Sequence, residues 1–177
     1  VLRNGEMAFP AMLDAIDKAA SSVNLSTYIF ENNSTGQAFI EALCTAANRG
    51  VAVRVIVDAM GELYSWPRIS RRLRRRGVRV ERFNPPRFMV QLPGLNLRNH
   101  RKLLVVDETI GFTGGMNIGD RHFVEQLATR HPTADTHFQL EGPVVAQLAM
   151  GFAQTWLLAT GQKLESPGGE QRECGDS

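Results

Sequence analysis

The chain has 177 residues, of which 43% are hydrophobic and 21% are charged, and its formal net charge is +2. This composition is typical of a globular domain with a core and excludes disorder throughout the chain. The sequence contains no apolar run long enough for a membrane-spanning helix or an intact signal peptide, and its two cysteines predict no disulfide framework.

Hydrophobic periodicity predicts three helices and three strands in the first part of the chain. The expected helices lie at about residues 9–20, 35–48 and 68–76, and the expected strands lie at 23–30, 51–57 and 78–83. Thr35 is the expected N-cap of the second helix, because its hydroxyl can accept a bond from a free backbone amide. A strand, a helix and a strand at this spacing indicate a parallel crossover unit.

The second part of the chain predicts a hairpin, a further strand and a long last helix. A loop rich in Pro and Gly precedes these elements, which lie at 103–106, 110–112, 136–140 and 145–159. We expect this loop, at 84–99, to form a flap that faces the substrate. From residue 162 onward the chain is polar and aperiodic, so the predicted domain covers 1–161 and a tail or linker covers 162–177.

A stretch in the middle of the chain, NHRKLLVVDETIGFTGGMNIGD, carries the residues most suited to chemistry. His100 and Lys102 are two residues apart on a predicted strand, so both side chains project from the same face. They suit a phosphate, because Lys supplies positive charge and neutral His can act as nucleophile or base. Gly114 and Gly115 would let the backbone approach a ligand, and Asn117 would add an amide donor for an oxyanion.

These residues form the pattern His, any residue, Lys, four residues, Asp, six residues, Gly, Gly, any residue, Asn. The pattern resembles the HKD signature of the phospholipase D superfamily. The superfamily often has Ser at the position of Gly115, whereas the cardiolipin synthase branch has Gly there, as this chain does. The stretches that also resemble this branch are STYIFENNSTG, DTHFQLEGP and FAQTWLLATG. The resemblance implies an α/β fold, namely a phospholipase D-like α-β-α sandwich with a mixed central sheet and helices on both faces.

Two aspartates have different expected roles. Asp107 completes the HKD motif, but it follows Lys102 by five residues, which places it at the far end of the strand. We therefore predict that Asp107 is a structural residue of the turn. Asp135 precedes the strand at 136–140, and the superfamily has an acidic residue here that bonds the motif His, so the resemblance implies that Asp135 orients His100. The alternative for Asp135 is an ordinary aspartate at the start of a strand.

Phosphodiester exchange by histidine requires a nucleophile that attacks phosphorus and an acid that protonates the leaving alcohol. His100 has Lys and Asn at the motif spacing, whereas His122, His131 and His137 do not, so we predict that these three are surface or structural residues. In the superfamily two HKD motifs meet at one site, which implies a second HKD half from the same natural chain or from a homodimer partner. Because the chain starts with Val1 and enters a helix at once, we expect a piece of a longer protein.

The resemblance to cardiolipin synthases implies that two phosphatidylglycerol molecules react through a phosphohistidine, with neither a metal nor another cofactor. Lys102 and Asn117 would hold the non-bridging oxygens, with Gly114 and Gly115 at the phosphate. One half alone leaves open whether His100 is the nucleophile or the acid. The expected location is the bacterial inner membrane, reached as a peripheral protein or through an anchor in a missing segment, with this fragment itself soluble.

Arginines are concentrated in one part of the chain. Residues 68–87 contain nine arginines and one acidic residue, Glu81. Such a patch could contact the anionic phospholipids of a membrane surface or the phosphates of a nucleic acid, and a solvated helix face is the alternative. Aromatic residues do not alternate with these arginines in the manner of a base-stacking surface.

Three functions remain open on the sequence alone. The favoured one is half of a cardiolipin synthase-like phosphatidyltransferase, because the resemblance extends beyond the motif to the later strand and helix. The second is a single-motif phospholipase or nuclease that acts as a homodimer, and nucleic acid is a partner in this alternative only. The third is a non-catalytic phosphate-binding module. An isolated half would also expose the surface meant for its partner, so we expect self-association or an exposed apolar patch.

Overall fold

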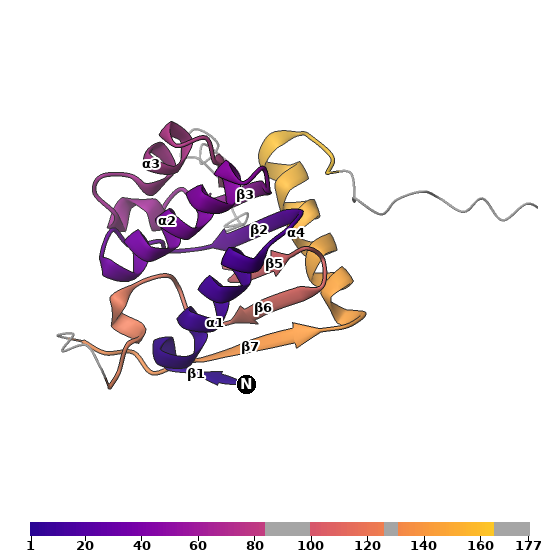
Figure 1. Ribbon diagram of the computed structural model, residues 1–177. Coiled ribbons are helices and arrows are strands. Elements are labelled where there is room, and N and C mark those ends of the chain that lie inside the picture. Colours follow the sequence, from indigo (N-terminus) through magenta and orange to yellow (C-terminus); the bar gives the residue numbers. More distant parts are fainter. Residues whose placement is uncertain (84–99, 126–130, 165–177) are drawn as a thin grey trace, which may run out of the picture.

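The computed structural model in Figure 1 describes residues 1–83, 100–125 and 131–164. Its centre is a seven-stranded sheet in the order β1-β7-β6-β5-β2-β3-β4. The strands are β1 (Leu2–Arg3), β2 (Ser22–Thr27), β3 (Ala52–Asp58), β4 (Arg79–Phe83), β5 (Leu103–Val106), β6 (Ile110–Gly114) and β7 (Thr136–Glu141). The helices are α1 (Asn4–Lys18), α2 (Ser34–Asn48), α3 (Ile69–Arg75) and α4 (Val144–Thr160), with 3₁₀ turns η1 (Gly61–Tyr64) and η3 (Asp120–His122).

The sheet has a parallel part and an antiparallel part. β2, β3 and β4 are parallel, because α2 and α3 carry the chain back between them. β5, β6 and β7 follow one another as antiparallel neighbours, and β5 also pairs with β2 and so joins the two parts. The predicted crossover unit and hairpin are confirmed, and the mixed sheet agrees with the predicted α/β sandwich.

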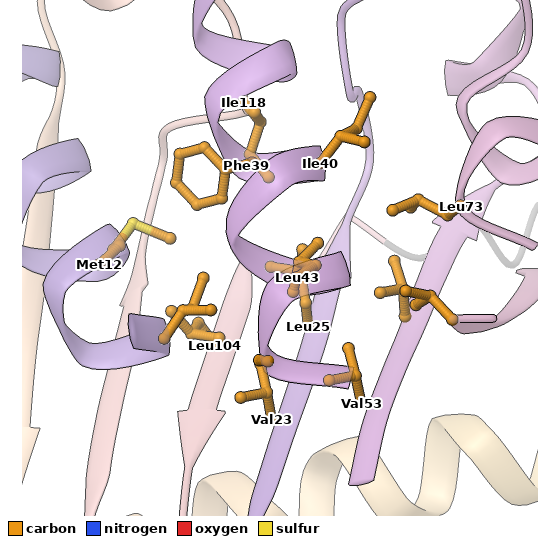
Figure 2. Close-up of a cluster of buried hydrophobic side chains, with 14 of the residues drawn as sticks. Met12, Val23, Leu25, Phe39, Ile40, Leu43, Val53, Leu73, Leu104 and Ile118 are labelled. Carbon is orange, nitrogen blue, oxygen red and sulfur yellow. The ribbon is translucent and has the colours of Figure 1, made fainter. Parts of the chain in front are cut away.

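Helices cover both faces of the sheet. Figure 1 shows α1, α2 and α3 on one face and α4 on the other. Figure 2 shows the larger buried cluster, in which Leu43 of α2 lies over Leu25 of β2, and Leu104 of β5 belongs to the same cluster. On the opposite face Val105 of β5 packs in a second cluster with Trp156 of α4. β5 is thus buried on both faces, as its uninterrupted apolar sequence predicts.

Several element boundaries differ from the sequence prediction, since α1 begins at Asn4 rather than about residue 9 and β1 was not predicted. α2 begins earlier than expected, and its N-cap is Asn33, whose Oδ1 accepts a hydrogen bond from Gly36 N at 3.2 Å. The prediction of Thr35 as the cap is wrong, because the Thr35 hydroxyl donates to the distant Asp120 carboxylate instead. β2 ends at Thr27, since the residues after it leave the strand and pair with the loop that follows β6.

The predicted flap at 84–99 and most of the predicted tail, at 165–177, lie outside the described residues. α4 ends at Thr160, and Gly161 follows with a φ of 71°, a left-handed conformation that favours Gly. Of the helices that the structure describes, none combines the length and the hydrophobicity that crossing a bilayer requires.

Candidate active site

The ends of several strands meet at one edge of the sheet, which we call the motif edge. β2 and β3 end there because they are parallel, and β5 begins there because it is antiparallel to β2. The loops at this edge lie at 28–33, 59–68, 100–102 and 115–122. Ile118 forms backbone hydrogen bonds with Ile29 and Glu31, so the last of these loops is joined to the first.

His100 lies at the motif edge, two residues before Lys102, and its side chain is exposed. Its ring stacks on Tyr28, with the ring centroids 4.6 Å apart and an interplanar angle of 14°. Stacking holds the plane of the imidazole and leaves its nitrogens open to a ligand. Tyr28 was not among the predicted site residues, and its aromatic ring at the end of a buried strand was the available signal.

Lys102 is partly buried beside His100. Its Nζ donates to the carbonyl oxygen of His100 at 2.9 Å and lies 5.7 Å from the centroid of the Tyr28 ring. Burial lowers the pKa of Lys102, and the negative charge of Asp135 partly offsets this effect. An ammonium group carries three protons, so two remain available to a phosphate.

Asp135 immediately precedes β7 and lies close enough to Lys102 to change its pKa. Its backbone pairs with Asn4 in both directions, from Asn4 N to Asp135 O at 2.9 Å and from Asp135 N to Asn4 Oδ1 at 3.0 Å. The carboxylate accepts a hydrogen bond from Thr136 N at 2.7 Å. In the described part of the chain no hydrogen bond joins it to the His100 ring, although both groups lie at the motif edge.

Close packing explains why the motif contains two glycines. A Cβ atom at Gly115 would collide with the Asp135 carboxylate, and one at Gly114 would collide with the Thr136 carbonyl oxygen and with His137. Gly114 of β6 is paired directly with His137 of β7. Both glycines therefore let β7 and Asp135 approach the motif, in addition to any contact with phosphate.

We expect Gly115→Ala to fold and to lose about 10- to 100-fold in phosphodiester turnover, the usual range for displaced groups at a site. The new Cβ would occupy the place of the Asp135 carboxylate and force it to rotate away from Lys102. Turnover is measured with a second HKD half present, beside the urea unfolding midpoint of the same variant.

The control for this prediction is a double-mutant cycle with Asp135→Ala. If Gly115 acts through the Asp135 carboxylate, the double variant should be no slower than Asp135→Ala alone, because the displaced group is already gone. Losses that multiply would show that Gly115 acts independently of Asp135.

Asn117 is oriented by two hydrogen bonds. Its Oδ1 accepts from Ile29 N at 3.0 Å, and its backbone N donates to His122 Nε2 at 3.2 Å. His122 is buried with Nδ1 3.1 Å from the Thr133 carbonyl oxygen, so its ring carries the proton on Nδ1, and burial lowers its pKa. The side-chain nitrogen Nδ2 of Asn117 has no partner among the described residues, so it is available to donate to a ligand. His122 thus supports the site from the core.

A surface pocket of about 570 Å³ opens beside the motif. His100, Lys102 and Gly114 line one side, and residues of α4, including Met150 and Gln154, line the other. A cationic wall that faces apolar and amide side chains suits a molecule with both a phosphate and a less polar part. In residues 1–83, 100–125 and 131–164, no cluster of three or more His, Cys, Asp or Glu side chains could hold a metal ion.

Asp107 lies at the end of β5 opposite His100 and is not part of this pocket. Its carboxylate accepts hydrogen bonds from Ala20 N at 2.8 Å, Ser21 N at 2.8 Å and Ser22 N at 2.7 Å, and from the Ser21 hydroxyl. Burial alone would raise the pKa of Asp107, but these hydrogen bonds outweigh it and lower the pKa. Asp107 therefore ties its turn to the start of β2.

Asp107→Ala is expected to lower the free energy of unfolding by about 1–2 kcal/mol, because several amides lose a charged acceptor. The native pKa lies below the unfolded value, so this contribution is present above about pH 4 and is lost as the pH falls through the native pKa. Urea unfolding at neutral pH and near pH 3 checks both parts. A difference from wild type that stays the same in acid would contradict the prediction.

Residues 12–156 match the family model described as cardiolipin synthase, PLD-like domain. The chain is 36% identical over 167 residues to a cardiolipin synthase of Geobacillus sp. (strain WCH70). It is 39% identical over 163 residues to cardiolipin synthase A of Pseudomonas aeruginosa (strain LESB58). These matches cover 94% and 90% of this chain but 33% and 32% of the two proteins, so the chain spans about a third of the length of the curated relatives it matches.

Two solved structures share the fold. Nuc from Salmonella typhimurium, a phospholipase D family member, aligns over 93% of this chain and 96% of that chain, with a TM-score of 0.65 and 20% identity. NucT from Helicobacter pylori aligns over 84% of this chain and 87% of that chain, with a TM-score of 0.65 and 17% identity. Both alignments agree with the predicted fold. Because the family model covers most of its length, the chain belongs to the phospholipase D superfamily, in the PLD-like domain family of cardiolipin synthases.

Proposed function

We propose that this chain is one half of a phosphatidyltransferase of the cardiolipin synthase kind, which completes its site with a second HKD half at the bacterial inner membrane. The observation that carries the proposal is the motif edge, where the His100 imidazole and the Lys102 ammonium line an open pocket. The side-chain nitrogen of Asn117 lies at the same edge and has no partner among the described residues. The similarity to cardiolipin synthases supports phosphatidylglycerol as the donor and the hydroxyl of a second phosphatidylglycerol as the acceptor.

The reaction has two steps. A ring nitrogen of His100 attacks the donor phosphorus and forms a P–N bond, while the P–O bond to the leaving glycerol breaks and an acid from the second half protonates its oxygen. The acceptor hydroxyl then attacks phosphorus, its proton returns to that acid, and His100 is released. The products are cardiolipin and glycerol. If His100 is the acid instead, the two halves exchange roles.

Lys102 and Asn117 bind the non-bridging oxygens of the phosphate. Lys102 keeps two protons for this task after its bond to the His100 carbonyl oxygen, and Asn117 is already oriented through its Oδ1. Donors that are fixed before the substrate arrives stabilise the negative charge of the transition state without reorganisation. Asp135, which lies beside Lys102, orients His100 once the second half and the lipid complete the site.

The outer face of α4 is the surface on which the second half docks. It exposes three large apolar side chains, with 58% of Met150, 43% of Leu157 and 77% of Leu158 accessible to solvent. Exposed apolar surface of this kind favours association. Met150 also lines the pocket, so a partner seated on α4 would reach the motif edge.

The test is incubation of phosphatidylglycerol vesicles with this chain, with a second HKD half taken from a related cardiolipin synthase, and with both. Light scattering first establishes that the two halves form a complex, and mass spectrometry then identifies the lipid products. We expect cardiolipin and glycerol only from the mixture. A complex without cardiolipin would contradict the proposal, and phosphatidic acid formed by this chain alone would indicate a homodimeric phosphodiesterase.

A further inference from the structure

The arginines of α3 point in two directions. Arg72 and Arg76 face α2, where Arg72 donates to Asn32 Oδ1 at 2.6 Å and to Gln37 Oε1 at 2.7 Å. Arg76 pairs with Glu41, with 2.7 Å between its Nη2 and Glu41 Oε2. These two arginines hold α3 against the rest of the fold, so they are not available to a ligand.

Three other arginines face outward. Arg68, Arg71 and Arg75 are exposed, and their spacing of three and four residues places them on one side of α3. Within the described residues none of the three forms an ion pair. They line a shallow surface pocket of about 430 Å³ together with Arg74 and Arg82. We call Arg68, Arg71 and Arg75 the outward arginines.

The structure narrows the basic patch that the sequence indicates at 68–87. Arg79 lies over the ring of Trp156 at 5.0 Å from its centroid, on the opposite face of the sheet, and Arg87 lies outside the described residues. Arg82 pairs with the buried Glu62 at 2.8 Å. Within the described part of 68–87, the exposed charge that has neither an ion pair nor a ring contact is therefore concentrated on the outward arginines.

Two exposed apolar side chains lie directly before these arginines in the chain. Trp66 is 85% exposed and Leu63 is 61% exposed. An indole ring that is exposed to water gains no free energy from burial of its apolar surface. At the interface of a bilayer this surface is buried while the N–H stays hydrated. Trp and Leu beside unpaired arginines are typical of segments that bind at an anionic membrane surface.

The same segment is joined to the wall of the candidate active site. The side-chain amide of Asn32 donates to the Trp66 carbonyl oxygen at 2.9 Å. Gly61, just before Leu63, packs so closely on the Tyr28 carbonyl oxygen that a Cβ would collide with it. Tyr28 in turn stacks on His100, so the exposed apolar residues and the motif histidine lie at the same edge of the sheet.

We propose that Leu63, Trp66 and the outward arginines form a docking surface for an anionic lipid bilayer. Leu63 and Trp66 enter the headgroup region, and the outward arginines contact the lipid phosphates. Docking itself needs no catalytic activity. Its consequence, that His100 at the motif edge is held toward the lipid, rests on the proposed transferase function.

The test is sedimentation of the chain with vesicles of equal parts phosphatidylcholine and phosphatidylglycerol, beside vesicles of phosphatidylcholine alone. We expect binding to the anionic vesicles that weakens as salt is raised, because the surface charge is screened. Tryptophan emission should shift to shorter wavelength on binding. The shift reports Trp66, because the chain has two tryptophans and Trp156 is fully buried.

Two variants remove the two parts of the surface. Leu63→Ala with Trp66→Ala, and the triple change of the outward arginines to Gln, should each weaken binding at least about tenfold, because a basic residue or a buried aromatic ring at an anionic surface contributes substantially to affinity. All five side chains are exposed, so both variants should fold, which thermal unfolding checks.

Matched controls separate the surface from its general charge and hydrophobicity. Replacing Arg3, Lys18 and Lys163 with Gln removes as many positive charges elsewhere, and Met7→Ala removes an apolar side chain that is 49% exposed on α1. Both controls should bind like wild type. Equal weakening in the charge-matched control would overturn the docking surface.

Two further outcomes would also overturn it. One is a wild-type chain that does not bind the anionic vesicles. The other is a chain that binds single-stranded or duplex nucleic acid through the outward arginines and does not bind vesicles.

A separate measurement distinguishes failure of the docking surface from failure of the proposed function. It is the turnover of a water-soluble short-chain phosphatidylglycerol in the presence of a second half. Vesicle binding without turnover would contradict the proposed function alone, and turnover without vesicle binding would contradict docking alone.

Discussion

Replacing His100 with Ala is expected to lower phosphodiester turnover by about 10³-fold or more in the complex of this chain with a second half. The His100 ring stacks on Tyr28 and lines the pocket. Under the proposed function the change removes the group that bonds to phosphorus or protonates the leaving alcohol. Because the side chain is exposed, the free energy of unfolding should change by less than about 0.5 kcal/mol.

The matched control is His131→Ala, because His131 is exposed and lies outside the motif and the pocket. We expect it to keep wild-type turnover. For comparison, Lys102→Met should lose about 10²- to 10³-fold, since under the proposed function it removes charge stabilisation but not the reacting group. Near-normal turnover by His100→Ala would exclude His100 from the chemistry. Under the proposed function, stopping the reaction with radiolabelled donor in an alkaline denaturant, which preserves the acid-labile P–N bond, would show which half carries the label.

Local patterns were sufficient to predict the central part of the fold. The uninterrupted apolar run of β5 predicted burial on both faces, and the structure confirms it. This prediction depends on the apolar pattern of neighbouring residues in the chain. The prediction that His100 and Lys102 share a face of a strand is wrong in its basis, because both residues precede β5. Their contact joins Lys102 Nζ to the backbone carbonyl oxygen of His100.

The supporting contacts of the site could not be predicted in the same way. Tyr28 meets His100, and His122 fixes Asn117, only because separate strands bring distant loops to the motif edge. The capping of α2 failed for the same reason, since the Asp120 carboxylate accepts the hydroxyl that the local pattern assigned to the helix N-terminus. Tertiary contacts of this kind override a local propensity.

The arginine-rich stretch shows how one composition conceals different roles. On the sequence the arginines of 68–87 are equivalent, but the structure separates Arg76, which pairs with Glu41, from Arg71, which faces solvent without an ion pair in the described residues. Helical spacing in the sequence separates the two faces of α3, but only the position of α2 in the fold decides which face is covered by protein and which faces solvent. Charge patterns therefore indicate a class of ligand, and packing indicates the side chains available to it.

Acid is expected to destabilise the fold through His137. Its side chain is 1% exposed, and neither ring nitrogen has a hydrogen-bond partner among the described residues. Burial lowers its pKa to about 4, although the nearby Asp135 partly offsets this effect and Lys102 adds to it. From the sequence His137 is expected to be a surface or structural residue, and the structure places it in the core next to Gly114.

The sign of the pH effect follows from the two pKa values. Above about pH 6.5 His137 is neutral in both the folded and the unfolded chain, so it imposes no cost. As the pH falls from about 6.5 toward 4, the unfolded chain binds a proton that the folded chain excludes, and the free energy of unfolding decreases by about 2–3 kcal/mol. Urea unfolding at about pH 7.5 and 5.5 measures the first part of this loss, about 1–1.5 kcal/mol, above the range where most carboxylates titrate.

His137→Leu should remove most of the acid sensitivity while keeping stability at neutral pH, because it also removes two buried polar atoms without partners. His131→Gln, at an exposed position, should retain the full loss. An equal decrease in His137→Leu and wild type would assign the effect to other groups.

The position of His137 also matters for the site. His137 lies two residues after Asp135 on the strand beside Gly114, so a proton on its ring would place a buried positive charge next to the motif. The neutral His137 ring therefore leaves Lys102 without a second positive charge close to it.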